Sequence, residues 1–179
     1  MPYLIIYYEV SLEMTNYVLI MAPAIILASV FTFFWGKIYD KRGFSFSSII
    51  SLGLLFIGYI LLYIFKSTIP VFVGSLFMMC GYLSGIGVFG AMIRDLTPEN
   101  KSGMFQGIRI VAQVLIPGIV GPYIGKTVLA NARIITNSDG TTSFVPNENI
   151  FIAALAVGLI TFVLTIFLTS GTTKQTPTA

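Results

Sequence analysis

Residues 36–44 read GKIYDKRGF, and this short segment decides the fold because it separates two long apolar runs. The runs on either side, 16–35 and 45–65, each hold enough residues to cross roughly 30 Å of hydrocarbon as a helix. The basic side chains of the segment are excluded from lipid, while its glycines permit a sharp reversal of the chain. The segment therefore predicts a tight turn between two membrane-spanning helices.

Three more apolar runs of spanning length follow, at 70–92, 107–130 and 149–169, and none of these runs contains Asp or Glu. An isolated strand leaves its backbone groups unpaired in lipid, and the runs are not the short alternating segments of a barrel. We therefore expect an all-α polytopic bundle of about five spanning helices. Residues 1–9 add a partial helix that is too short to span, and they lack the basic start of a signal peptide.

The composition also indicates that the helices are surrounded by lipid and not by water. Of the 179 residues, 56% are apolar and 9% are charged, whereas soluble proteins carry about a quarter charged residues. The scattered basic residues do not form a stripe that could follow a nucleic acid, so none is expected as a partner. With one cysteine, Cys80, in an apolar run and no histidine, we expect no disulfide, no metal site, no cofactor and no enzyme activity.

The basic residues also predict the orientation, because Lys and Arg beside spanning helices favour the cytoplasmic side. One side is expected to hold most of them, namely Lys37, Lys41, Arg42, Arg94, Lys101, Arg109 and Lys174, against Lys66, Lys126 and Arg133 on the other. The carboxyl terminus is therefore expected in the cytoplasm of a multi-pass cell-membrane protein. The polar residues 171–179 are expected to form a disordered tail, and residues 131–148 a small exposed hairpin around the turn signal NSDG.

The segment at 36–44 resembles the loop signature of the major facilitator superfamily, which joins the second and third helices of a half. The signature is a glycine, three residues, an aspartate, a basic residue, one more residue and a glycine. It is matched here by Gly36, Asp40, Lys41 and Gly43, whereas Phe44 replaces the usual final basic residue. The resemblance implies a conformational switch made of Gly36, Asp40, Lys41, Arg42, Gly43 and Arg94. A generic positive-inside loop is the alternative interpretation.

A second motif, RDLTPENKSGMFQGIR, occupies residues 94–109. Thr97 before Pro98 and Glu99 predicts a helix start, with a hydroxyl cap, a proline at the first position and an acid in the first turn. This loop is similar to the fourth-to-fifth or tenth-to-eleventh connection of facilitator halves, most of all in the glycoside-pentoside-hexuronide cation symporters related to the melibiose carrier. A half has six helices, so the chain is expected to be a fragment, best matched to the carboxyl half.

Small residues suggest where helices approach one another closely. Residues 117–125 read PGIVGPYIG, which resembles the glycine-proline element of facilitator antiporters and keeps an efflux role open. A tight helix crossing is the other interpretation. The positions expected to pack closely are Gly81, Gly85, Gly118, Gly121, Pro122 and Gly125.

Carriers of this kind bind their solute near the midplane, so we look for polar side chains inside apolar helices. The candidates for solute binding are Tyr7, Tyr8, Glu9 and Gln113. The tyrosines and Glu9 have an interfacial alternative, and Arg109, which shares a helix face with Gln113, is expected to extend toward the cytoplasmic surface. Tyr59 and Tyr82 are weaker candidates.

These residues and resemblances predict part of a secondary transporter that moves a sugar or similar small solute by alternating access within the lipid bilayer. The missing half is expected as its partner. Because no acid lies in the five runs, a coupling cation, sodium or a proton, is expected to bind to that half. The alternatives are a drug or metabolite efflux carrier and, from another class, a non-transporting membrane scaffold or truncated gene product.

Overall fold

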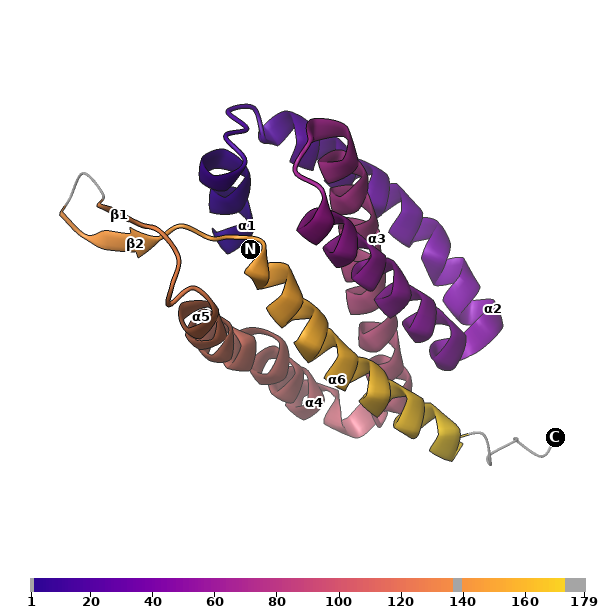
Figure 1. The fold of residues 1–179 in the computed structure, drawn as a ribbon. Coiled ribbons are helices and arrows are strands. Elements are labelled where there is room, and N and C mark those ends of the chain that lie inside the picture. The colour runs from indigo at the N-terminus through magenta and orange to yellow at the C-terminus, as the bar shows by residue number, and fades with distance from the viewer. Residues whose placement is uncertain (1, 137–139, 173–179) are drawn as a thin grey trace.

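The computed structural model describes residues 2–136 and 140–172, and these residues form a bundle of long helices with one small hairpin (Figure 1). The helices are α1 (Pro2–Ile6), α2 (Val18–Ile64), α3 (Thr68–Leu96), α4 (Ser102–Ile110), α5 (Ile116–Val128) and α6 (Asn149–Thr172). Four helical segments of the described chain are long and apolar enough to cross a membrane: Val18–Ile64, Thr68–Leu96, Ser102–Val128 and Asn149–Phe167. The all-α polytopic fold class is confirmed.

Helix α2 is two helices joined at Gly43, and the reversal is visible near the α2 label of Figure 1. Gly43 has φ 76° and ψ −178°, a backbone conformation that is essentially restricted to glycine. The first limb of α2 (18–42) covers most of the apolar run 16–35, and the second limb (44–64) covers the run 45–65. The basic segment therefore continues the first limb as helix, and one residue makes the turn.

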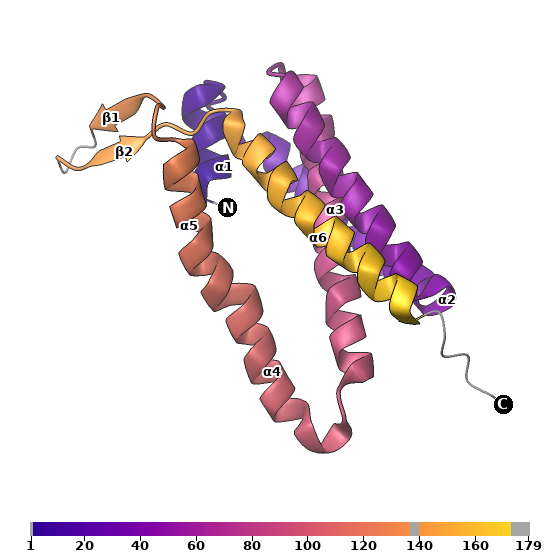
Figure 2. The same ribbon diagram turned by 60° about the horizontal axis from the view of Figure 1, so that its bottom comes forward.

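The bundle has two ends, which we name by what they hold. The Gly43 end contains the reversal in α2, the end of α3 and the start of α4, and the end of α6 lies toward it (Figure 2). The hairpin end contains strands β1 (Ile134–Thr136) and β2 (Thr142–Phe144), which pair antiparallel with Ile135 opposite Ser143. The expected hairpin is confirmed, although its turn residues 137–139 and the expected tail from residue 173 onward lie outside the described residues.

The second limb of α2 and α3 approach each other at the level of their backbones. A Cβ added to Gly81 would lie 2.7 Å from Leu55 Cα, and one added to Gly58 would lie 2.6 Å from Met78 Cα. Small residues at a crossing let two helices make close van der Waals contact without side chains between them. Gly81 was expected at a close crossing, whereas Gly58 was not recognised from the sequence.

A serine pair adds a polar link to the same interface. Ser84 Oγ and Ser51 Oγ are hydrogen bonded at 2.9 Å, and both side chains are buried. We expect Ser51→Ala to lower the free energy of unfolding by about 0.6 kcal/mol, because Ser84 keeps its bond to the Cys80 carbonyl. Thermal unfolding in detergent measures the change, and Ser29→Ala, which removes an exposed hydroxyl bonded within its own helix, is the control. A loss above about 2 kcal/mol would contradict this modest value.

The amino-terminal segment packs into the core rather than lying on its surface. After α1 the chain makes a π-helical turn, Tyr7–Ser11, and the side chains of Tyr7 and Tyr8 are 1% and 0% exposed. Tyr8 Oη and Ser75 Oγ are 2.7 Å apart, which ties this turn to α3. The ring of Tyr7 meets that of Phe151 edge to face at 5.2 Å, which ties it to α6.

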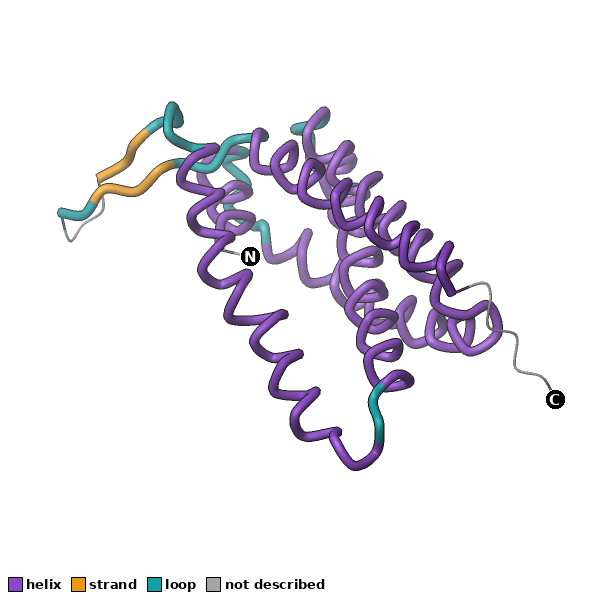
Figure 3. Tube along the Cα trace, turned by 90° about the horizontal axis from the view of Figure 1, so that it is seen from below, coloured by secondary structure: helices purple, strands orange, loops and turns teal. Residues whose placement is uncertain are grey.

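Helices α4 and α5 form one long arm that diverges from α3 at the Gly43 end and returns beside α6 at the hairpin end (Figures 2 and 3). A π-helical turn, Val111–Leu115, joins them. Pro117 has no N–H for the carbonyl of Gln113, so a regular α-helical bond is impossible there. The arm has a single buried residue, Gly125.

The structure corrects part of the expected helix packing, because this arm is exposed. Gly118 and Gly121 have no heavy atom within 4 Å of an added Cβ, and the same holds for Gly85 on α3. They make no close crossing here, because glycine spacing identifies a smooth helix face but not the helix that covers it. Gly125 is contacted instead by the ring of Tyr3, 2.6 Å from an added Cβ, and Pro122 lies inside α5.

The prediction that Thr97 caps the start of the next helix is wrong. Thr97 ends α3 with extended backbone, and its Oγ1 donates backward to the Ile93 carbonyl at 2.5 Å. Pro98, likewise extended, precedes a short 3₁₀ turn, Glu99–Lys101, that has no side-chain cap. Proline disfavours the helical conformation in the residue before it, so Thr97 is extended and α3 ends at Leu96. The hydroxyl of Thr97 then bonds back to the last turn of α3.

Candidate functional site

A cavity of about 540 Å³ lies between α5, α6 and the second limb of α2. Its wall on α5 includes Gly121 and Gly125, and its wall on α6 includes Ala153 and Ala154. Because these side chains are small or absent, two helices that face each other leave space between them. Tyr3, Tyr59 and Tyr82 line the rest of the wall together with apolar side chains.

The cavity extends from the middle of the helices to the hairpin end, where Val128 of α5 and Ile150 of α6 line it. Tyr82 is the central residue of Thr68–Leu96, and Thr161 is at the centre of Asn149–Thr172. Pro117, another lining residue, is two positions past the centre of the arm Ser102–Val128. For helices that cross a bilayer, the middle of the helix is the middle of the membrane, which is where secondary carriers bind their solutes.

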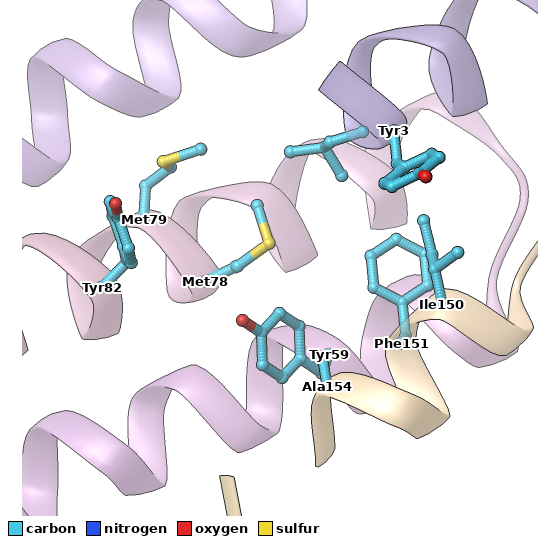
Figure 4. A pocket seen from close by; sticks show the side chains of 9 residues that line it. Tyr3, Tyr59, Met78, Met79, Tyr82, Ile150, Phe151 and Ala154 are labelled. Carbon is cyan, nitrogen blue, oxygen red and sulfur yellow. The ribbon is translucent and has the colours of Figure 1, made fainter. Parts of the chain in front are cut away.

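A second cavity of about 250 Å³ adjoins the first and extends it toward α1 (Figure 4). Both cavities are lined by Tyr3, Tyr59, Tyr82, Ile150 and Ala154, and we call the combined space the tyrosine cavity. Figure 4 shows the side chains of Met78, Met79 and Phe151 completing its smaller part.

Most of the hydroxyl groups in the wall of this cavity lack a hydrogen-bond partner in the described chain. Among residues 2–136 and 140–172, the hydroxyls of Tyr3, Tyr59 and Tyr82 have no hydrogen-bond partner in the protein. Thr161 Oγ1, by contrast, donates to the carbonyl of Val157 at 3.2 Å. An unpaired hydroxyl in an apolar environment costs free energy, so these three groups are suited to a ligand or water that pairs with them.

The residues expected to bind a solute are not gathered at this cavity. Tyr7 and Tyr8 are core residues behind it, and Glu9 is exposed on the π-helical turn. Gln113 is on the exposed arm, where its Oε1 accepts from Arg109 Nε at 3.0 Å. The structure therefore separates these four residues, and their role in solute binding stays a prediction.

Arg109, which was expected to extend toward the cytoplasmic surface, reaches toward α3 in the structure. One terminal nitrogen of its guanidinium lies 2.8 Å from a Cβ added to Gly90, so the side chain crosses from α4 to α3. The absence of a side chain at Gly90 leaves room for it. With Gln113 holding Nε, the guanidinium is fixed across the space between the diverging helices.

Three of the six residues expected to form a conformational switch line one cavity at the Gly43 end, and their role in switching stays a prediction. Gly36, Asp40 and Arg94 line one cavity of about 270 Å³ between the first limb of α2 and α3. Beside them, Tyr39 Oη donates to Asp95 Oδ2 at 2.8 Å, and Asp95 pairs with Arg94 at 3.2 Å. Two helices of the bundle are thus linked by a polar network beside the Gly43 reversal.

Cations and aromatic rings surround that network. The ammonium of Lys37 lies 5.7 Å and 5.6 Å from the ring centres of Phe33 and Phe34, and the guanidinium of Arg42 lies 5.3 Å from that of Phe46. Aromatic rings beside Lys and Arg are typical of the membrane interface, where both the apolar stem and the charge are accommodated. Lys41, also in the expected switch, is exposed.

At the hairpin end, Lys66 pairs with Glu148 at 3.2 Å and joins the α2–α3 loop to the start of α6. The pKa of the Glu148 carboxyl is lowered, chiefly by a hydrogen bond from its own backbone and further by Lys66, while partial burial opposes the shift. A lowered pKa in the folded state means that the stabilisation is present above the unfolded pKa, near 4.3, and is lost as pH falls through the folded value.

We expect Glu148→Gln to lower the free energy of unfolding by less than about 1 kcal/mol at pH 7, because the pair is exposed. As the pH falls through the lowered pKa of Glu148, the variant and the original chain should converge. Unfolding curves collected across this pH range test the prediction. A difference that persists unchanged at the acid end would show that the carboxylate charge is not responsible.

Sequence reasoning ranked Tyr59 and Tyr82 below the amino-terminal tyrosines, whereas the structure places Tyr59 and Tyr82, and not Tyr7 or Tyr8, in the wall of the cavity. A signal was available, since both are isolated aromatic hydroxyls within apolar runs of spanning length. What the sequence lacked was the neighbour of each helix, which decides whether a tyrosine faces a cavity, lipid or core.

Comparison with known proteins gives one match. A family model described as Major Facilitator Superfamily matches residues 1–179. No curated protein and no solved structure matches the chain.

Proposed function

The chain belongs to the Major Facilitator Superfamily, and we propose that it forms one helical bundle of a carrier that moves a small solute across the membrane by alternating access. The observation that carries this proposal is the tyrosine cavity. It extends from the middle of the helices to the hairpin end, and it combines a volume suited to a small molecule with three hydroxyls that have no partner in the described chain.

Alternating access requires a second bundle, and the chain's own surface supports this part of the proposal. The arm formed by α4 and α5 exposes large apolar side chains such as Val114, Ile119 and Tyr123, which are 64%, 66% and 71% exposed. Lipid covers some of these groups, and the second half of the carrier covers the rest. The two bundles then rock against each other, so that the solute is accessible from each side of the membrane in turn.

The network at the Gly43 end is proposed as the switch between the two states. Asp40 faces a cavity with Arg94, and Tyr39 and Asp95 connect the first limb of α2 to α3. Under the proposed orientation, with the carboxyl terminus in the cytoplasm, this network lies on the cytoplasmic side. Contact of Asp40 with the second bundle would stabilise the state that is closed to the cytoplasm.

Coupling to a cation needs a site outside the tyrosine cavity. No Asp or Glu is among the residues that line it in the described parts of the chain, so a sodium ion or a proton has no carboxylate there. We therefore propose that any coupling site belongs to the second bundle. The resemblance to the melibiose-type symporters stays a prediction.

The two solute classes that the sequence left open, a sugar for uptake and a drug-like metabolite for efflux, differ in the polarity of the site they need. A specific observation favours the second class: apolar side chains, with Met78 and Met79 among them, make up most of the wall. Efflux of an apolar metabolite is therefore the second candidate function.

Flux measurements test the carrier proposal. The chain is reconstituted in liposomes with and without a complementary facilitator half, and uptake of labelled glucose and of 1-naphthol is followed. We expect flux only with both halves present, and about a tenfold loss in Asp40→Asn, because the switch loses its charge. Glu13→Gln, which removes an exposed acid at the other end, is the control. Equal flux of both solutes through the chain alone and through protein-free liposomes, with no gain from the second half, would overturn the proposal.

A further inference from the structure

The guanidinium of Arg109, which lies between α3 and α4, has most of its hydrogen-bond donors unused. Within residues 2–136 and 140–172 it makes one hydrogen bond, from Nε to Gln113 Oε1 at 3.0 Å. The N–H groups of its two terminal nitrogens have no partner in that part of the chain, and no carboxylate there forms an ion pair with them. The side chain is half-buried, so these donors are partly shielded from water. A cation in such surroundings needs a counter-charge.

This guanidinium also lies within the membrane-spanning part of both helices. Gly90, which it contacts, is eight residues or about 12 Å from Tyr82, the central residue of α3. Arg109 itself is six residues or about 9 Å from Leu115, at the centre of Ser102–Val128. The hydrocarbon layer extends about 15 Å from the middle of a bilayer. A charge at this depth is costly unless it is paired, and such charges are typical of functional sites.

The two helices supply no counter-charge of their own at this level. Residues 68–93 of α3 and residues 102–128 of the arm include no Asp or Glu. Asp95, the acid nearest to Gly90 along α3, already accepts a hydrogen bond from Tyr39 and pairs with Arg94. The counter-charge is therefore expected from outside these helices.

The orientation of the guanidinium suits a ligand with two adjacent oxygens. Gln113 occupies Nε, whereas the two terminal nitrogens remain and form an edge that can donate two parallel bonds to a carboxylate. Because Gly90 has no side chain, one of these nitrogens lies against α3. The guanidinium is thus held from two sides, and a ligand would lose little free energy in ordering it.

The position of Arg109 favours a small anion over two larger sources of negative charge. The phosphate of a lipid lies in the headgroup region and would have to move into the hydrocarbon layer to reach this guanidinium. A helix of a second bundle would cover the face of the arm opposite to Arg109, where Met104 and Val111 are 57% and 46% exposed. A small free anion can enter from the Gly43 end, where α4 diverges from α3 (Figures 2 and 3).

We propose that Arg109 is the centre of an anion site that binds the carboxylate of a small organic anion. The ligand pairs with the terminal nitrogens, neutralises the guanidinium and connects α4 to α3. The site shares no residue with the tyrosine cavity, and it does not depend on the carrier function proposed above.

Chemical modification of the full chain in phosphatidylcholine nanodiscs tests the proposal. Phenylglyoxal reacts with guanidinium groups that are not paired with an anion, and peptide mass spectrometry gives the rate at each arginine. We expect benzoate to slow the modification of Arg109 about fivefold or more, and its uncharged counterpart benzamide to leave the rate unchanged. Arg133, which is exposed at the hairpin end, is the reference and should react at the same rate in both solutions. Nanodiscs that contain phosphatidylglycerol, without benzoate, form a separate arm.

Two glycine variants of α3 provide a matched pair. A Cβ at Gly90 would lie 2.8 Å from a terminal nitrogen of Arg109, so Gly90→Ala displaces the guanidinium but keeps its charge. The displaced atom is the end of a flexible side chain, so the variant should fold, whereas Gly85→Ala has open space around its new methyl group. We expect the protection by benzoate to fall below about twofold in Gly90→Ala and to remain about fivefold in Gly85→Ala. Benzoate should also raise the melting temperature of the original chain and not that of Arg109→Gln.

Equal protection by benzoate and benzamide, or equal protection in the two glycine variants, would overturn the site. Slow modification in the phosphatidylglycerol nanodiscs without benzoate would assign the position to a lipid headgroup and overturn the small anion as the ligand. Slow modification that requires a complementary facilitator half, with no effect of benzoate on the chain alone, would assign the counter-charge to the second bundle, with the same consequence. The expected protection in a chain that gives no flux with any complementary half would overturn the carrier proposal and leave this site in place.

Discussion

Gly81→Ala is expected to lower the melting temperature of the bundle by about 5–10 °C, because the new methyl group has no place to go. The added Cβ would lie 2.7 Å from both Leu55 Cα and the Ser51 carbonyl oxygen, which are backbone atoms of α2. A flexible side chain can turn aside, but a helix backbone must move as a whole. Separating the second limb of α2 from α3 would also weaken the bond between Ser84 and Ser51. We expect a loss of about 2–3 kcal/mol in the free energy of unfolding.

The chain contains its own reporters for this measurement. Cys80 is the single cysteine and is buried, so its reaction with a maleimide dye during heating follows the opening of the core. Trp35, the single tryptophan, is also buried and gives an independent fluorescence signal on the first limb of α2. Gly85→Ala is the matched control, since it lies one turn further along α3 with open space around it. Equal melting temperatures for the two variants would refute the backbone contact.

Gly43→Ala is expected to destabilise the protein by about 1–3 kcal/mol and to impair the reversal of α2. With φ at 76° and ψ at −178°, Gly43 occupies a region that a Cβ makes sterically unfavourable. No neighbouring atom is within 4 Å of an added Cβ, so the whole cost comes from the backbone and not from packing. Alanine also favours a continuous helix through this position, which would compete with the folded-back form.

Stability and shape are measured together for this variant. Spin labels at positions Phe34 and Ile49, one on each limb, report the distance across the reversal. The Cys80 assay, carried out on a separate sample without spin labels, reports the melting temperature. Gly53→Ala, a helical glycine with open space, is the control and should have little effect. A Gly43→Ala protein that retains both the distance and the melting temperature would show that this backbone conformation is not required for the turn.

Several expectations from the sequence depended only on local chemistry, and these agree with the structure. The lengths of the apolar runs lead to long helices, and the turn signal NSDG is flanked by the two strands of the hairpin. Gly43 was expected in a sharp turn because glycine alone tolerates such backbone angles, and its positive φ agrees. The family resemblance drawn from residues 36–44 and 94–109 is supported at the level of the superfamily.

Other features could not be predicted from the sequence, because they depend on which helix lies opposite. Gly81 and Gly85 are both smooth positions of α3, yet only Gly81 meets a backbone. Tyr7 and Tyr82 are both aromatic hydroxyls in apolar surroundings, yet Tyr7 is buried in the core and Tyr82 lines the cavity. Thr97 had a helix on either side of it, and its hydroxyl bonded to the earlier one.

The amino-acid sequence by itself determined the lipid environment, the helices and the point at which the chain reverses. Hydropathy, span length and the backbone freedom of glycine are properties of neighbouring residues along the chain. Only the tertiary structure decided which small residues form a crossing, which tyrosines face a cavity and which polar groups gather at the Gly43 end. These features arise where helices distant in sequence meet, and their relative rotation sets what each side chain contacts.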